Sequence, residues 1–144
     1  MLIRSIKTLA VRMERHNSNA MIISEFLNNH KKIRKVRYPG LESDNNHKIA
    51  SKQMKGFGGI ISVELDSDIK GTLKFLEIID IFTLAESLGG VESLIEHPAI
   101  MTHASIEKNI REGLGISDSL VRLSIGIEDP DDLKVALNKA LDLI

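Results

Sequence analysis

The chain has 144 residues, of which 42% are hydrophobic and 27% charged, so it has the composition of an ordinary globular domain with enough residues for a hydrophobic core. Its 19 basic and 20 acidic side chains give a formal net charge of −1, and no apolar run approaches the roughly 20 residues of a membrane span, so composition gives no argument for a nucleic-acid or membrane partner. The sequence has no cysteine, which excludes disulfides, cysteine nucleophiles and thiolate metal sites and favours a reducing compartment, the cytoplasm.

The first predicted element is a long amphipathic helix over residues 2–27. Its apolar side chains recur at three- and four-residue steps, and they are Leu2, Ile6, Leu9, Met13, Ala20, Ile23 and Leu27. The polar Asn17 interrupts this stripe. Residues 1–13 are basic and acid-free like a transit peptide, but the stripe continues past Glu14 and Arg15, so we interpret it as structural. No capping residue precedes the stripe, so we expect this helix to be the later part of a longer one.

Two strands with a helix between them are predicted next. Residues 33–38 alternate between polar and apolar side chains and end at a Pro-Gly turn. A helix opened by Ser43 or Asp44 is predicted to run to about residue 54. Residues 60–65 are predicted to form a strand with good β-formers, since Ile61, Val63 and Leu65 share one face.

The middle of the chain predicts a helix, a strand and a polar tip. Residues 69–79 follow an Asp-Ser-Asp capping sequence, and residues 81–85 have the character of a buried strand. The strand is followed at once by Glu86, Ser87 and a Leu-Gly-Gly hinge, and residues 91–96 then show helical spacing. Packing alone does not explain an acid and a hydroxyl at the tip of an apolar strand.

The last part of the chain predicts two helices around a strand. Ser105 is a plausible cap for a short helix over residues 106–114, and residues 121–127 alternate clearly as a strand. The Asp-Pro-Asp-Asp sequence at 129–132 supplies an N-cap, a first-turn proline and two acids for a final helix. Because strands and helices mix without a strict βαβ repeat, we predict an α+β fold, with one sheet and helices on one face.

Arg122 is the first candidate binding residue, because it lies mid-strand between two apolar residues that point to the opposite face. It could be solvated or could pair with Glu64 or Glu128. Alternatively, its guanidinium could grip a carboxylate through two parallel hydrogen bonds. The small residues Ser124 and Gly126 on the same face leave room beside the arginine, which slightly favours a ligand.

Ser87 is the second candidate. It could be a turn or cap residue, or the backbone N–H groups of residues 87–90 could bind an anion, since glycines let a turn approach a ligand closely. There is no Gly-rich nucleotide loop and no Gly-x-Ser-x-Gly elbow, and His97 and His103 are only a weak metal signal. The residues alone therefore predict an anion-binding α+β domain.

Four segments resemble the C-terminal part of the trans-sulfuration family of pyridoxal-phosphate enzymes, which includes cystathionine γ-synthases, cystathionine γ- and β-lyases and methionine γ-lyase. They are RSIKTLAVRMERHNSNA, VRYPGLESDNNHKIASKQMKGFGGIISVEL, IFTLAESLGGVESLIEHPAIMTHASI and LVRLSIGIED. The segments occur in the family's order and cover the chain from about residue 4 to its end. The γ-synthases and γ-lyases are the members that the segments resemble most.

The resemblance implies the small C-terminal domain of the aspartate-aminotransferase-like fold, with a mostly antiparallel sheet, helices on one face and a long N-terminal helix. Residues 1–30 would be a truncated interdomain helix with a partly exposed stripe, and residues 31–144 the small domain. The cofactor implied by the family is pyridoxal 5′-phosphate, but the Schiff-base lysine of its Ser-x-Thr-Lys context is absent from this sequence. We therefore expect a fragment that is inactive alone.

The resemblance also implies partners for the chain. The family is homotetrameric, so we expect the fragment to self-associate or to need the missing cofactor domain. The alternative is a non-catalytic remnant or an interaction module that pairs with a full-length relative.

By match of motif, the resemblance places the substrate site at the polar tip and the arginine strand. Arg122 would clamp the α-carboxylate of a sulfur amino-acid substrate, and Ser87 would be the second contact, through its hydroxyl and neighbouring N–H. Glu86 would stand at the rim, where relatives that handle cystathionine often carry an acid. Thr102 would line the pocket.

Overall fold

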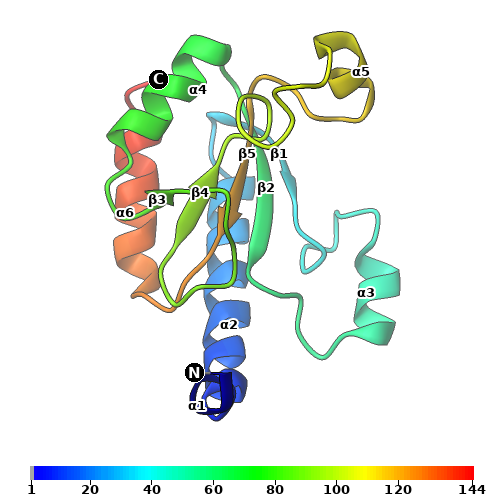
Figure 1. Cartoon of the computed structure of the whole chain (residues 1–144), viewed down its shortest axis with the longest axis vertical. Coiled ribbons are helices and arrows are strands. Elements are labelled where there is room, and N and C mark those ends of the chain that lie inside the picture. Colours follow the sequence, from blue (N-terminus) through cyan, green and yellow to red (C-terminus); the bar gives the residue numbers. More distant parts are fainter. Residues whose placement is uncertain (1) are drawn as a thin grey trace.

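The computed structural model describes residues 2–144, and Met1, the first residue of the predicted interdomain helix, lies outside them. The elements follow the chain in this order (Figure 1): α1 (Leu2–Ile6), α2 (Leu9–Asn28), β1 (Ile33–Arg37), α3 (His47–Gln53), β2 (Ile60–Leu65), α4 (Ile69–Ile78), β3 (Thr83–Leu84), β4 (Leu94–Glu96), α5 (Lys108–Gly113), β5 (Leu120–Ser124) and α6 (Pro130–Leu141). Helices and strands thus mix in the way that the sequence predicts.

The strands form one five-stranded sheet in the order β1-β2-β5-β4-β3. β2 pairs antiparallel with β1 and β5, and β5 pairs antiparallel with β4, whereas the short edge strand β3 runs parallel to β4. The prediction of a mostly antiparallel sheet is therefore confirmed. Because β5 lies between β2 and β4, residues of three distant segments meet at the middle of the sheet.

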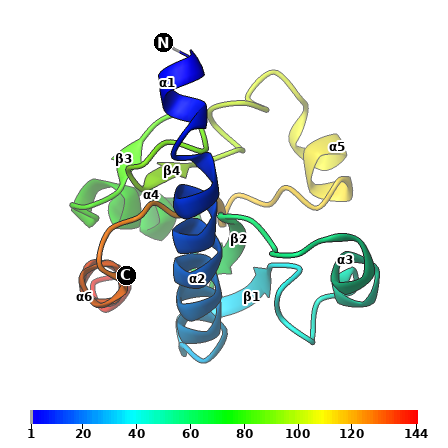
Figure 2. The same ribbon diagram turned by 90° about the horizontal axis from the view of Figure 1, so that it is seen from below.

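The hydrophobic core lies between one face of the sheet and the helices α2, α4 and α6. It contains Ala20, Ile23, Leu27, Ile61, Val63, Leu65, Phe75, Val121, Leu123, Leu133, Leu137 and Leu141. Figure 2 shows α2 passing across the sheet. In this view α4 and α6 lie to the left of α2, and α3 and α5 lie to its right. The alternating polar residues of β2 and β5 consequently occupy the opposite face, which we call the open face of the sheet.

The helix predicted over residues 2–27 is two helices in the structure. Between α1 and α2 the Thr8 hydroxyl and the Arg12 guanidinium both donate hydrogen bonds to the Ser5 carbonyl, at 3.3 and 3.1 Å. Side chains that compete for helical carbonyl groups weaken the backbone ladder, so the helix breaks here. The apolar stripe is buried only in its second half, and its first half is exposed at Leu2, Ile6, Leu9 and Met13.

Polar side chains of α2 bind the chain that follows β5. The buried Asn19 amide donates to the carbonyl oxygens of Gly126 and Glu128, at 3.0 and 2.8 Å. His16 Nδ1 lies 2.7 Å from the Ile125 carbonyl oxygen. These carbonyl groups lie beyond the last residue of β5 and need donors from elsewhere. His16 and Asn19 thus join α2 to the chain that follows the central strand.

Two local predictions are confirmed. β2 spans the predicted residues, and Ile61, Val63 and Leu65 are its buried positions. α6 begins at Pro130 with Asp129 as its N-cap, whose carboxylate accepts a hydrogen bond from Asp131 N–H at 2.9 Å. Both elements are specified by patterns within a few residues of chain.

The helices α3 and α5 begin later than predicted. Before α3, the Asp44 carboxylate accepts a hydrogen bond from Asn46 N–H at 2.8 Å, so it stabilises a turn instead of opening the helix. Before α5, the predicted cap Ser105 lies in a turn in which Ile106 N–H donates to the His103 carbonyl at 3.1 Å. Local turn hydrogen bonds therefore displace both helix starts.

The strand predictions differ most around the polar tip. The strand predicted over residues 81–85 is reduced to Thr83–Leu84 at the sheet edge, and the segment 91–96, interpreted as helical, contains β4. Ile95 of β4 pairs with Leu123, and both side chains are buried in the core. Pairing with the central strand therefore overrides the helical spacing of this segment.

We predict that Asn19→Ala lowers the free energy of unfolding by about 1–3 kcal/mol, because two backbone carbonyl groups lose their buried donor. Urea unfolding followed by circular dichroism measures the change. The control is Ser18→Ala, at an exposed position of the same helix. Equal stability of the two variants would show that these bonds do not hold α2 to the sheet.

Candidate functional site

Arg122 lies in the middle of β5 with its side chain on the open face of the sheet. Its neighbours Val121 and Leu123 are 1% exposed in the core, so strand alternation turns the arginine the other way. In the register of the sheet it is flanked by Ser62 on β2 and Glu96 on β4. Its side chain is 26% exposed. The guanidinium is therefore anchored in a central strand and still reaches solvent.

The guanidinium of Arg122 forms an ion pair with Glu96, whose side chain is only 1% exposed. Arg122 Nη2 contacts Oε2 of this carboxylate, and Thr102 Oγ1 donates a hydrogen bond of 2.5 Å to Oε1. Both oxygens of the buried carboxylate therefore have partners. This compensation is what a charged group in the interior of a protein requires.

The partners that the sequence suggested for the arginine are engaged elsewhere. Glu64 pairs with Arg37 of the neighbouring strand. Glu128 accepts hydrogen bonds from Ser93 N–H at 2.6 Å and from its hydroxyl at 2.9 Å, at the start of β4. An ion pair was one of the two predicted interpretations, but the partners named for it were wrong.

Sequence reasoning missed Glu96 because it interpreted residues 91–96 as helical. The useful signal was Pro98, since the residue before a proline is biased toward extended backbone and a helix usually ends there. That bias favours an extended segment running into the His-Pro pair. No feature near Glu96 in the sequence identifies its partner on β5, because their pairing depends on the sheet.

The loop between β3 and β4 brings Ser87 to Arg122, as the match of motif predicts. The Ser87 carbonyl oxygen accepts a hydrogen bond from Arg122 Nη2 at 3.4 Å, whereas the resemblance implied the hydroxyl and the N–H of this loop. Gly89, with a φ of +76°, donates its N–H to Ser124 Oγ at 3.0 Å. The loop is therefore attached to the central strand beside the arginine.

The small residues next to the arginine admit this loop, so the prediction that they leave room for a ligand is wrong. A Cβ atom at Gly126 would lie 2.5 Å from the Val91 carbonyl oxygen and 2.7 Å from the carbonyl carbon of Glu92. Ile127 N–H donates to the same Val91 oxygen at 2.9 Å. Because the chain meets the loop here, β5 ends at Ser124, earlier than predicted.

The other two predicted site residues lie on either side of β4. Glu86 is exposed in the loop before β4, next to Ser87. Thr102 follows β4, and its hydroxyl reaches Glu96 and also lies 2.8 Å from Nδ1 of His103. Thr102 is thus connected to the arginine through Glu96. The substrate role of both residues stays a prediction.

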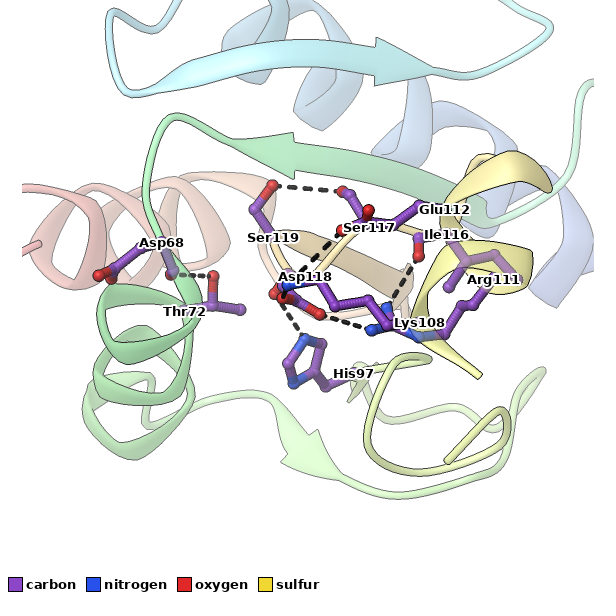
Figure 3. A network of polar contacts seen from close by, with 10 residues as sticks. All are labelled: Asp68, Thr72, His97, Lys108, Arg111, Glu112, Ile116, Ser117, Asp118 and Ser119. Carbon is purple, nitrogen blue, oxygen red and sulfur yellow. Dashed lines mark hydrogen bonds and ion pairs between the residues drawn. The ribbon is translucent and has the colours of Figure 1, made fainter. Parts of the chain in front are cut away.

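The segment between β4 and β5 that carries the threonine is closed at its base by a network of polar contacts (Figure 3). The Asp118 carboxylate accepts hydrogen bonds from the buried Arg111 at 2.6 Å and from Lys108 at 2.5 Å. The Asp118 carbonyl oxygen lies 2.8 Å from Nε2 of His97. These contacts join the two ends of a long excursion and thereby hold the threonine near Glu96.

Three groups of this network have displaced pKa values, and for Lys108 the hydrogen bond to Asp118 raises the pKa. Hydrogen bonds from Lys108 and then Arg111 hold the pKa of the Asp118 carboxyl below its usual range. Burial lowers the pKa of His97, and the hydrogen bond to the Asp118 carbonyl opposes this only in part. Nε2 of His97 faces a carbonyl oxygen and so carries the hydrogen, while its buried Nδ1 has no hydrogen-bond partner among residues 2–144. The fold therefore accommodates the neutral ring.

Residues 2–144 form neither a metal centre nor a covalent cofactor site. No group of three His, Asp or Glu side chains in this range could hold a metal ion. Every lysine of the chain is exposed or half-buried, whereas a Schiff-base lysine is activated by a desolvated or charged setting. The described residues therefore do not fit the covalent site of pyridoxal phosphate. Within the same range, no helix has the length and apolar character needed to cross a membrane.

We predict that folding stability decreases as the pH falls below about 6.5, the ordinary pKa of histidine. In that range the unfolded chain binds more protons than the folded chain, because the pKa of folded His97 is lowered, so the free energy of unfolding falls with decreasing pH. Urea unfolding at about pH 8 and about pH 5.5 measures how the free energy of unfolding changes with pH, and both pH values lie above the ordinary pKa values of carboxyl groups. His97→Gln should be less stable than the parent at the higher pH but show a shallower slope. An unchanged slope would contradict this assignment.

Known proteins similar to this chain define its family. Residues 1–142 match the family described as Cys/Met metabolism PLP-dependent enzyme. Similar curated proteins include a cystathionine β-lyase of Coxiella burnetii, which is 59% identical over 98% of this chain and 36% of the relative. A cystathionine γ-lyase of Dictyostelium discoideum is 53% identical over 97% of this chain and 36% of the relative. A cystathionine γ-lyase of Bos taurus is 49% identical over 96% of this chain and 34% of the relative. The chain spans about a third of the length of the curated relatives it matches. The resemblance is thereby confirmed: this chain belongs to the Cys/Met metabolism family of enzymes that depend on pyridoxal phosphate.

Proposed function

We propose that this chain forms the substrate-carboxylate side of a cystathionine lyase that depends on pyridoxal phosphate, and that Arg122 binds the α-carboxylate of a sulfur amino acid. The β- and γ-lyase names of the relatives favour a lyase over the γ-synthase that the motifs also allowed. In this proposal residues 31–144 are the small C-terminal domain of an aspartate-aminotransferase-like fold, and residues 1–30 belong to its interdomain helix. The cytoplasm, expected from the cysteine-free composition, is part of the same proposal.

The placement of Arg122 is the observation that carries the proposal. Its Nη2 faces Glu96 and the Ser87 carbonyl, while its Nη1 and Nε have no hydrogen-bond partner among residues 2–144. A planar guanidinium can offer two such N–H groups in parallel to one carboxylate. Because the side chain rises from a central strand, a carboxylate bound there would be held in a defined position, which is an orientation effect.

The other predicted residues take supporting roles in the proposal. The exposed Ser87 is the second carboxylate contact, through its hydroxyl. Glu86, exposed on the same loop, stands at the rim and faces the distal part of the substrate. Thr102 lines the pocket and also donates its hydroxyl hydrogen to Glu96.

Pyridoxal phosphate, when bound, supplies the electron sink for the reaction. Because the described lysines do not fit its covalent site, we propose that residues outside this chain hold the cofactor and that this chain alone does not turn over cystathionine. The contribution of these 144 residues is then to bind and orient the amino acid.

A second candidate function is an interaction module that pairs with itself or with a longer relative. The observation that favours it is the exposed apolar surface of α1 and the start of α2, formed by Leu2, Ile3, Ile6 and Leu9. Leu2 and Ile3 are 87% and 79% exposed, and apolar patches of this kind commonly mark contact surfaces. Both candidates use this surface, but only the first requires Arg122.

We predict that the purified chain, mixed with pyridoxal phosphate and reduced with borohydride, shows no single preferred lysine adduct by mass spectrometry and no cystathionine cleavage. Cleavage that appears when a separately produced cofactor domain of the Coxiella burnetii relative is added would support the lyase proposal. Absence of cleavage in the mixture would support the interaction module. Cleavage by the chain alone would overturn the proposed division of roles.

We predict that Arg122→Lys weakens binding of L-cystathionine to this chain by roughly tenfold or more, because lysine keeps the charge but cannot offer two parallel N–H groups, and a hydrogen bond to a charged group is worth about 1.5–3 kcal/mol. Titration followed by nuclear magnetic resonance (NMR) gives the dissociation constants. Arg34→Lys is the matched control, since Arg34 is also a strand arginine in an ion pair, with Asp66, but lies away from the site. Equal affinities of the two variants would refute the assignment of Arg122.

A further inference from the structure

We infer that Glu96 sets the ligand specificity of the Arg122 site, because its charge removes the advantage that a simple carboxylate anion would have over a zwitterionic amino acid at an unpaired arginine. The inference rests on the proposed function of Arg122 as a carboxylate-binding residue. It assigns Glu96 a role that goes beyond holding the arginine in place. The argument has three steps: the burial of Glu96, its charge, and the charge of the ligand.

Glu96 stays in the site when a ligand binds. Its side chain is 1% exposed, one oxygen pairs with Arg122, and the other accepts the 2.5 Å hydrogen bond from Thr102. A buried carboxylate that lost these partners would lack the solvent to replace them. A ligand carboxylate therefore joins the ion pair at the unused Nη1 and Nε groups and does not displace Glu96.

A ligand that carries only a negative charge is penalised by this arrangement. It is attracted by the guanidinium and repelled by the Glu96 carboxylate on the other side of it. For unit charges about 7 Å apart and an effective dielectric constant of about 40, Coulomb's law makes this repulsion equivalent to roughly a tenfold loss of affinity. The Arg122–Glu96 pair thus presents the N–H groups of the guanidinium to a ligand, while the Glu96 carboxylate offsets part of the positive charge.

A zwitterionic amino acid escapes most of this penalty. Its ammonium group is attracted by Glu96 to about the extent that its carboxylate is repelled, because the two groups lie close together in one small molecule. The charge of Glu96 therefore lowers the affinity for the anion and leaves that for the amino acid nearly unchanged. This is discrimination by a repulsive element built into the site.

A second ion pair on the open face, between Arg37 of β1 and Glu64 of β2, allows a matched control variant. The Glu64 side chain is 16% exposed. Glu64→Gln removes the same charge from the same face as Glu96→Gln. It frees a different arginine, so it separates an effect on Arg122 from a change in the overall charge of the face.

The test compares L-methionine with 4-(methylsulfanyl)butanoate, which is the same molecule without the amino group. Dissociation constants are taken from the NMR signal of the Arg122 side-chain Nε–H in the parent chain and in both variants. In the parent the two constants should agree within about threefold. Glu96→Gln should lower the dissociation constant of the anion about tenfold and that of L-methionine less than about threefold. Glu64→Gln should leave the ratio of the two dissociation constants within about twofold of its value in the parent.

Glu96→Asp separates the charge of Glu96 from the position of its carboxylate, because it keeps the carboxylate on a shorter side chain. It should preserve the ratio of the two dissociation constants found in the parent, and it also serves if Glu96→Gln fails to fold by circular dichroism. The inference is overturned if Glu96→Gln leaves the ratio unchanged, if Glu96→Asp shifts it as Glu96→Gln does, or if the parent already binds the anion about tenfold more tightly than methionine. An Arg122 signal that responds to neither probe in the parent overturns the proposed function itself.

Discussion

The ion pair between Arg122 and the buried Glu96 carboxylate is the interaction on which the rest of the open face depends. A carboxylate that is 1% exposed is tolerated only when both oxygens have partners, and here the guanidinium and the Thr102 hydroxyl supply them. Breaking such a pair by removing one partner costs about 3–5 kcal/mol. The pairing of β4 with β5 and the folding of the segment between them are therefore energetically linked, since neither compensates the charge alone.

The same need to compensate buried polar groups explains the ends of the central strand. After β5, the carbonyl groups of residues 125, 126 and 128 receive hydrogen bonds from His16 and Asn19 of α2. Before β5, Asp118 is held by Arg111 and Lys108. Both ends of the strand are thus fixed by polar side chains from other elements. In the proposed function, this rigid strand lets Arg122 hold a carboxylate in a defined orientation.

Elements specified by neighbouring residues could be predicted from the sequence, and elements specified by distant pairing could not. The alternation of β2 and the Asp-Pro start of α6 are local patterns, and both predictions hold. The helical spacing of residues 91–96 is equally local, but the segment is drawn into the sheet by its pairing with β5. For the site, motif similarity predicted that Arg122 and the Ser87 loop lie together, and the Ser87 carbonyl accepts a hydrogen bond from Arg122, while their substrate roles stay predictions. Glu96 was missed because its partner is visible only once the sheet is assembled.

The small residues beside Arg122 show how far sequence can go toward a binding site. A serine and a glycine next to a strand arginine indicate that something approaches the backbone closely, but they do not say whether it is a ligand or the chain itself. Here it is the chain, because Ser124 binds Gly89 and the backbone at residues 91 and 92 occupies the space that a side chain at Gly126 would fill. The loop then places the Ser87 carbonyl against one nitrogen of the guanidinium. Gly126 therefore lets the loop between β3 and β4 pack against the chain that follows β5.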